Sequence, residues 1–163
     1  MNTADRSVEA LDSALRRRFI FESKMPKPDE LINQAGQVNL QTLLTTINNR
    51  LTILKDSDHT IGHAWLWEVD SIEKLKAVFA NKILPLLQEY FYNDYEKLGL
   101  VLGDAFFELP HKRVDGNDFP LFSASSGLSS QYKNKYIYKL KSSEDLGEAE
   151  FLTLTQLPVI NAE

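Results

Sequence analysis

Two groups of polar side chains in this sequence have the chemistry to act on a phosphate group. Asn2 carries a neutral amide, which can hold an attacking water in line with a phosphorus atom without adding charge. Arg17 and Arg18 carry guanidinium groups, which can stabilise the charge that develops on a transferring phosphoryl group. Each group also has a simpler interpretation, because one asparagine near a terminus carries little meaning and adjacent arginines often form a solvated basic helix end.

The residues between these two groups predict a short amphipathic helix. Ser7 is a suitable N-cap, and apolar residues follow at helical spacing at positions 8, 11 and 15. Arg16 begins the basic cluster, which falls in the last turn, where cations suit the helix dipole. The apolar run at residues 19–21 then favours a β-strand, which the prolines at 26 and 28 end.

The first nineteen residues also resemble a known signature. They contain Met-Asn-Thr-Ala-Asp and then Leu-Asp-Ser-Ala-Leu-Arg-Arg-Arg-Phe, which is similar to McrB-type GTPases, the AAA+ motors of modification-dependent restriction systems. The resemblance implies that Asn2 senses the γ-phosphate and that Arg17 and Arg18 reach the nucleotide of a neighbouring subunit. It also implies a nucleotide-binding role for Asp5, for which a turn that caps the helix is an equal alternative.

Two later segments resemble the helical lid of the same family. Ile61-Gly62-His63 is similar to its Ile-Gly-His motif, and residues 81–91 are similar to a segment that reads Ile-x-Pro-Leu-Leu-x-Glu-Tyr-Phe. The resemblance implies that Gly62 and His63 contact the nucleotide or orient the lid, since a glycine lets backbone approach a ligand closely. The alternative is a glycine at a helix entry with a histidine packed beside Trp65.

We predict a mainly α fold in three parts. Residues 1–24 would be the last helix and strand of an AAA+ α/β core, residues 25–103 the helical lid, and residues 104–163 a C-terminal extension. In the extension, the β-prone runs 136–140 and 151–155 are expected to form a small β pair behind a long loop.

Apolar periodicity predicts the helices of the lid. A short helix is expected from Pro28 to near Gly36, and a longer one after a cap at Asn39. Pro85 must kink the next apolar stripe or start a new helix, so we expect two helices that meet near Asn81. A last helix is expected from 94 to 102, closed by a glycine at 103. The expected core contains Leu43, Leu44, Ile47, Leu51, Leu75, Phe79, Leu86 and Leu87.

The sequence of 163 residues contains no Gly-x-x-x-x-Gly-Lys-Ser/Thr motif and no apolar run that ends in paired acids before Asn2. The phosphate loop and the magnesium ligand of a nucleotide-hydrolysing enzyme are therefore missing from it. We expect GTP and Mg²⁺ to be cofactors of the intact protein and neither to be bound by this chain alone. The chain is then expected to be the C-terminal portion of such a motor, whether as an expressed fragment, from a misplaced start or from a split gene.

Composition excludes several other classes of protein. There is no cysteine, so a disulfide framework and a thiolate zinc site are excluded, and His59 and His111 lack partners at metal-ligand spacing. Apolar runs are too short to cross a bilayer and the first residues do not form a signal peptide, so we expect a cytoplasmic protein without a membrane partner. The net charge of −5 argues against a nucleic-acid footprint over the whole surface.

The resemblance implies partners for the intact system. These are further copies of the subunit in an AAA+ ring and an McrC-like nuclease, with DNA bearing modified cytosine engaged indirectly. Two alternatives stay open at this point. One is a stand-alone helical module that binds protein or DNA, and the other is part of a MoxR-like AAA+ ATPase, because the residues that read the base lie largely outside this chain.

Overall fold

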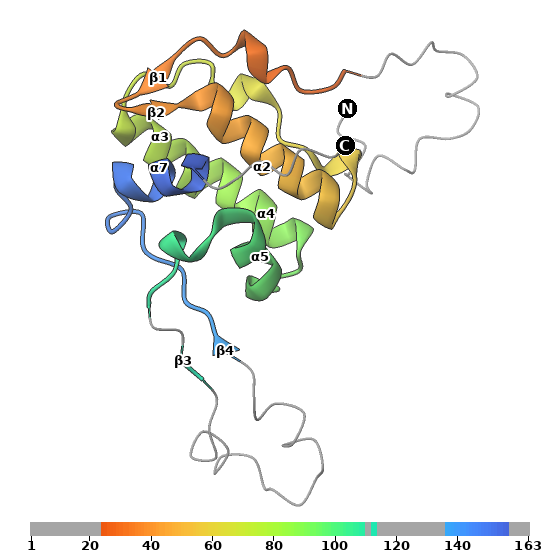
Figure 1. The fold of residues 1–163 in the computed structure, drawn as a ribbon, viewed down its shortest axis with the longest axis vertical. Helices are drawn as coiled ribbons and strands as arrows, with labels where there is room; N and C mark the ends of the chain where they lie inside the picture. Colours follow the sequence, from red (N-terminus) through yellow and green to blue (C-terminus); the bar gives the residue numbers. More distant parts are fainter. Residues whose placement is uncertain (1–23, 110–111, 114–135, 157–163) are drawn as a thin grey trace, which may run out of the picture.

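The computed structural model describes residues 24–109, 112–113 and 136–156, and these residues are mainly helical (Figure 1). A small hairpin precedes the long helix α2, and helices α5 and α7 both pack against α2. A second strand pair, β3 and β4, projects away from the helices (Figure 1). The predicted mainly α fold is confirmed. Of the expected core segment 1–24, only the last residue is described.

Helix α2 spans Leu40–Leu54 and follows its predicted pattern. The Asn39 side chain caps it by accepting a hydrogen bond from the Thr42 backbone N–H at 2.8 Å. Its apolar stripe is fully buried, and it consists of Leu40, Leu43, Leu44, Ile47 and Leu51. The helix therefore forms because one local cap and one continuous buried face agree.

The segment before α2 is not the short helix that we predicted. A single 3-10 turn, η2, covers Pro28–Glu30, and the antiparallel strands β1 (Gln34–Ala35) and β2 (Val38–Asn39) follow it. Gly36 turns the chain between the strands with a φ of +60°, a conformation that glycine adopts without steric cost. The helical expectation fails because this turn is fixed from outside, by the Glu148 carboxylate, which accepts a hydrogen bond from the Gln37 N–H.

Pro85 is accommodated by a π-helical turn. Helix α3 (Ile72–Val78) passes into the π-helix η5 (Phe79–Ile83), and α4 (Leu84–Tyr90) continues from it. The Leu84 N–H bonds to the Phe79 carbonyl five residues back, so the chain widens before the proline ring. We predicted two helices that meet near Asn81, and Asn81 lies inside the turn that joins them.

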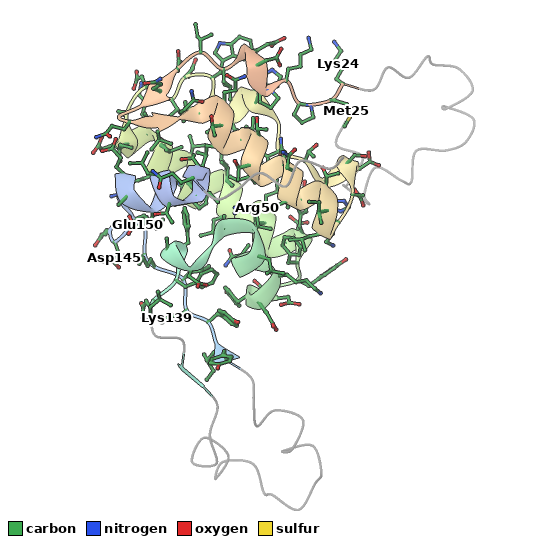
Figure 2. All side chains as sticks on the ribbon, viewed as in Figure 1. Lys24, Met25, Arg50, Lys139, Asp145 and Glu150 are labelled. Atoms are coloured by element: carbon green, nitrogen blue, oxygen red, sulfur yellow. The ribbon has the colours of Figure 1, made fainter. Side chains whose placement is uncertain are left out.

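Helix α5 spans Tyr95–Leu102 and ends at Gly103, as predicted. Arg50 of α2 enters the interface between α2 and α5 (Figure 2). Its Nη1 donates to the Val101 carbonyl in the last turn of α5, where a cation suits the helix dipole. Burial lowers the pKa of Arg50.

The C-terminal extension corrects one strand assignment. Strand β4 (Tyr136–Ile137) pairs with β3 (Lys112–Arg113), whereas the predicted strand 151–155 lies in helix α7 (Glu148–Gln156). Phe151 and Leu154 are both fully buried at a spacing of three residues, which places them on one face of a helix. Tertiary packing therefore overrides the β-prone composition of this run.

Helix α7 completes the hydrophobic core. The Phe151 ring lies 5.3 Å from Phe79 of the π-helical turn and 5.5 Å from Phe106 of the 3-10 turn η6 (Asp104–Phe106), as measured between ring centroids. Of the eight predicted core residues, all are buried except Leu86, which is half-buried and packs against the core.

Candidate functional site

The sequence-predicted site residues fall into two sets. Asn2, Asp5, Arg17 and Arg18 lie outside the described residues. Gly62 and His63 lie within them, on the connection between α2 and α3, where Gly62 precedes and His63 begins the 3-10 turn η4 (His63–Leu66). The site that the structure describes is therefore the surface around this connection.

Gly62 is exposed between two anchored neighbours. Its backbone has a φ of −70° and a ψ of 138°, which is an extended conformation open to any residue. An added Cβ would meet no atom within 4 Å in the described part of the chain. Among the described residues, no acceptor takes a hydrogen bond from the Gly62 N–H. The glycine therefore leaves an open stretch of backbone that an outside group can approach.

His63 is held by residues 24–33, which precede strand β1 and are called the entry segment below. Its Nδ1 accepts a hydrogen bond from the Lys27 backbone N–H at 3.2 Å, and its Nε2 lies 3.3 Å from a Glu30 carboxylate oxygen. This arrangement corresponds to a ring whose proton is on Nε2 and whose Nδ1 is an acceptor. The ring lies 5.7 Å from that of Trp67, as measured between ring centroids. His63 thus links the entry segment to the η4 turn.

The entry segment carries its own ion pair. Lys27 Nζ lies 3.0 Å from a Glu30 carboxylate oxygen. The hydrogen bond between them raises the pKa of Lys27 and lowers the pKa of Glu30, and His63 adds to the effect on Glu30. Both side chains are exposed, so the pair contributes little stability. Its role at this site is to place a carboxylate against the His63 ring.

Asn48 is a site residue that sequence reasoning missed. It lies on the inner side of α2, only 7% exposed, and both ends of its amide bind the backbone of Ile61. Its Nδ2 donates to the Ile61 carbonyl at 2.9 Å, and its Oδ1 accepts from the Ile61 N–H at 2.7 Å. The available signal was an amide next to the apolar stripe of a predicted helix, since buried amides need partners.

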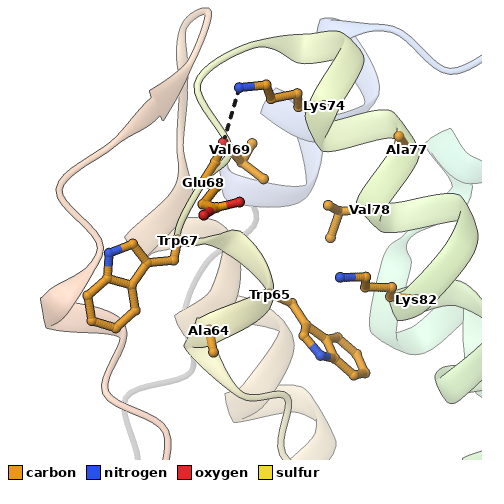
Figure 3. A pocket seen from close by; sticks show the side chains of 9 residues that line it. All are labelled: Ala64, Trp65, Trp67, Glu68, Val69, Lys74, Ala77, Val78 and Lys82. Atoms are coloured by element: carbon orange, nitrogen blue, oxygen red, sulfur yellow. Dashed lines mark hydrogen bonds between the residues drawn. The ribbon is translucent and has the colours of Figure 1, made fainter.

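A groove of about 600 Å³ adjoins the connection. One wall carries the indole of Trp65, and the other wall, formed by α3 and the π-helical turn, carries Lys82 (Figure 3). Trp67 points away from the space between them (Figure 3). The groove is lined by Ala64, Trp65, Trp67, Glu68, Val69, Lys74, Ala77, Val78 and Lys82.

The two lysines of the groove differ in their partners. Lys74 binds the Asp70 carboxylate at 2.7 Å and reaches the Glu68 carbonyl at 3.4 Å. Lys82 has no ion-pair partner within the described part of the chain. An indole face opposite an unneutralised ammonium group suits a planar, anionic ligand.

Other kinds of site find no support in the described segments. Within residues 24–109, 112–113 and 136–156, no group of three or more metal-ligating side chains comes together. Nor does this part of the chain contain a helix of the length and apolarity that crossing a membrane requires.

Comparison with known proteins gives two matches. Residues 39–99 match the family model of the McrB alpha-helical lid domain. The chain is also similar to the type IV methyl-directed restriction enzyme EcoKMcrB subunit of Escherichia coli (strain K12), with 31% identity over 129 residues. That alignment covers 64% of this chain and 28% of the relative, so the chain spans less than a third of the relative's length.

Proposed function

We propose that this chain, whose residues 39–99 match the McrB alpha-helical lid domain, belongs to the McrB family and supplies the lid of a GTP-dependent AAA+ motor in a modification-dependent restriction system. The observation that carries the proposal is the lid itself, with the Ile61-Gly62-His63 connection fixed on its surface and Gly62 open to approach. A lid of this kind has to present backbone and side chains to a nucleotide held by another part of the motor.

The nucleotide contact that we propose is made by the exposed Gly62 backbone. Its N–H, for which the described residues offer no acceptor, can donate to a phosphate or base acceptor, and the absence of a side chain permits a short distance. His63 orients the lid by holding the entry segment through Lys27. Trp65 and Lys82 extend the surface with an indole and a positive charge.

The remaining roles belong to the residues outside the described part. We propose that Asn2 positions the attacking water on the nucleotide of its own subunit and that Asp5 belongs to the same nucleotide-binding turn. Arg17 and Arg18 are proposed to act on the neighbouring subunit's nucleotide, because a helix-length of chain separates them from Asn2. GTP and Mg²⁺ would then be bound by the assembled ring, which would drive an McrC-like nuclease on modified DNA.

A chimaera tests this proposal. The aligned segment of the E. coli relative is replaced by this chain, and Mg²⁺-dependent hydrolysis of GTP and ATP is measured beside that of the 163-residue chain alone. We expect GTP turnover by the chimaera and none by the chain alone, because the phosphate loop comes only from the relative. Turnover by the chain alone, or a chimaera that hydrolyses only ATP, contradicts the proposal.

Variants of the chimaera separate the roles. Asn2→Ala should retain GTP binding and lose hydrolysis, whereas Arg17→Ala with Arg18→Ala should lose hydrolysis only in the assembled ring. Mixing the arginine variant with a subunit defective in its own phosphate loop should restore activity at interfaces where an intact finger meets an intact site. Absence of rescue in a ring that contains both subunits contradicts the trans-acting role.

The Gly62 contact is tested with a matched glycine. Gly62→Ala should weaken GTP binding by the chimaera, whereas Gly147→Ala, at the start of α7 and away from the groove, should not. Equal GTP affinity of the two variants would exclude close approach of the nucleotide at Gly62.

A further inference from the structure

The side-chain amide of Asn48 pairs with the backbone of Ile61 in the way that a residue of a neighbouring β-strand would. It offers one donor and one acceptor to the donor and acceptor of a single residue, Ile61, thirteen positions along the chain. The Ile61 side chain is fully buried, so its backbone polar groups are desolvated and need these partners. Asn48 thereby fixes both the position and the direction of the backbone at Ile61.

This attachment immediately precedes the open glycine. On its N-terminal side, Gly62 is held through Ile61 to α2, and on its C-terminal side it is held through His63 to the Lys27 N–H. The exposed Gly62 backbone thus lies between two hydrogen-bonded attachments, one to Asn48 of α2 and the other to Lys27 of the entry segment. Of the two, only the Asn48 anchor is buried, and it is therefore the one that water does not compete for.

We propose that Asn48 is the positioning residue of the Gly62–His63 connection, which sets the direction of the Gly62 N–H before any ligand is present. As a role in GTP binding, this rests on the proposed function. The requirement is specific to the side chain: leucine has similar volume but neither polar group, and aspartate keeps the acceptor but loses the donor. Glutamine has both groups but is longer by one methylene.

The chain contains a built-in probe for this inference. Its two tryptophans are Trp65, in the η4 turn that follows Gly62, and Trp67, the residue that caps the end of that turn. Tryptophan fluorescence, acrylamide quenching and near-ultraviolet circular dichroism of the 163-residue chain therefore report on this connection. Hydrogen exchange of the Ile61 amide adds a direct measure of the bond to Asn48.

The experiment compares Asn48→Leu with a control that weakens the core elsewhere. Leu98→Ala removes a buried side chain of α5 and leaves both Asn48 bonds in place. In Asn48→Leu we expect altered tryptophan dichroism, stronger quenching and roughly tenfold faster exchange at Ile61 under native conditions. In Leu98→Ala these signals should stay as in the parent chain.

Two results overturn the inference. One is an unchanged tryptophan signature and Ile61 exchange rate in Asn48→Leu, and the other is an equal change in both variants, which would indicate general loosening. If Asn48→Leu does not fold, Asn48→Asp, which retains one of the two bonds, should show an intermediate change, and no change there also overturns it.

The GTP affinity of the chimaera distinguishes this inference from the proposed function. If Asn48→Asp changes the tryptophan signature and also weakens GTP binding, both stand. If the signature changes and GTP affinity does not, Asn48 positions the connection, but the proposed nucleotide contact at Gly62 fails.

Discussion

Gly36 and Gly62 each lie in a connecting segment of the same helical domain, and their surroundings are opposite. Gly36 has a φ of +60°, and a Cβ added there would overlap the Glu148 carboxylate of α7. Gly62 has a φ of −70°, and within residues 24–109, 112–113 and 136–156 a Cβ added there would meet nothing within 4 Å. The folded chain therefore requires a glycine at 36 and makes no such demand at 62.

This difference separates a glycine that the fold requires, Gly36, from one that leaves the backbone accessible to a ligand, Gly62. The closed turn at Gly36 is sealed by α7, which is in turn held by the aromatic core around Phe151. The open segment at Gly62 is held at both neighbours, through Ile61 by Asn48 and through His63 by the Lys27 N–H, and a Cβ added at 62 would meet no atom of the described residues. A backbone that is anchored on both sides and open to approach suits a ligand-binding connection.

The largest effect on stability is expected from truncating Phe151, which holds α7 over the Gly36 turn. Phe151→Ala deletes a fully buried ring that contacts Phe79 and Phe106, and it should lower the free energy of unfolding by about 3–5 kcal/mol. Chemical denaturation of the chain measures this, with the exposed Leu100→Ala as control. A loss below about 1 kcal/mol would show that α7 does not seal the Gly36 turn.

The next effect comes from the closed glycine itself. Gly36→Ala should cost about 1–3 kcal/mol, because alanine is strained at positive φ and its methyl group displaces the Glu148 carboxylate. The double variant with Glu148→Ala should relieve the part due to the clash, and denaturation measures both. If Gly36→Ala is as stable as the parent chain, the contrast between the two glycines disappears.

A smaller effect is expected from the ion pair that holds the start of α7. Burial alone would raise the pKa of Glu150, but hydrogen bonds from Lys141 at 2.9 Å and from the Gly147 N–H at 2.8 Å outweigh it and leave the pKa lowered. The resulting stability is present above the ordinary value of 4.5 and is lost as the pH falls through the lower folded value. We expect a loss of about 0.5–1 kcal/mol on acidification that is absent in Glu150→Gln.

Denaturation at several pH values measures this loss. The matched control is Glu108→Gln, which removes an exposed pair with Lys139 and should change the acid dependence less. An acid dependence that persists unchanged in Glu150→Gln would assign the effect to other carboxylates.

The smallest effect on stability is expected from substituting Gly62, the open glycine of the comparison. Gly62→Ala should change the free energy of unfolding by no more than about 0.5 kcal/mol, because the methyl group meets no atom and the backbone conformation is unstrained. Denaturation beside Gly36→Ala gives the direct contrast. An equal cost at the two positions would mean that Gly62, too, is required by the fold.

The elements that could be predicted from the sequence are those whose causes are local. Helix α2 has a cap at Asn39 and a continuous apolar stripe, and α5 ends at Gly103. Each feature lies within a few residues of the element it defines, so periodicity and capping were sufficient. The Pro85 interruption was located for the same reason, although its π-helical form was not foreseen.

The elements that could not be predicted depend on distant partners. The hairpin at Gly36 consists of two-residue strands whose turn is fixed by Glu148, more than a hundred positions away. The run 151–155 is β-prone by composition and becomes helical because Phe151 and Leu154 have to reach one core. Rules that use only neighbouring residues could predict neither of these contacts.

The candidate site divides in the same way. Gly62 and His63 were found through a resemblance to the lid motif, and the structure adds how they are held. Asn48 was missed because its partner, Ile61, lies thirteen positions along the chain, beyond the end of α2, and an amide in a helix has many uses. The roles predicted for Asn2, Asp5, Arg17 and Arg18 stay predictions, since these residues lie outside the described part.

The aromatic core has a consequence for the order in which the protein is made. Phe79 and Phe106 leave the ribosome well before Phe151, which follows Phe106 by 45 positions. At synthesis rates of about 5–20 residues per second, the third ring arrives roughly 2–9 seconds after the second. During that interval the nascent lid has two large apolar rings without their cover and a Gly36 turn without Glu148. Folding of this domain is thus completed only when α7 has been translated.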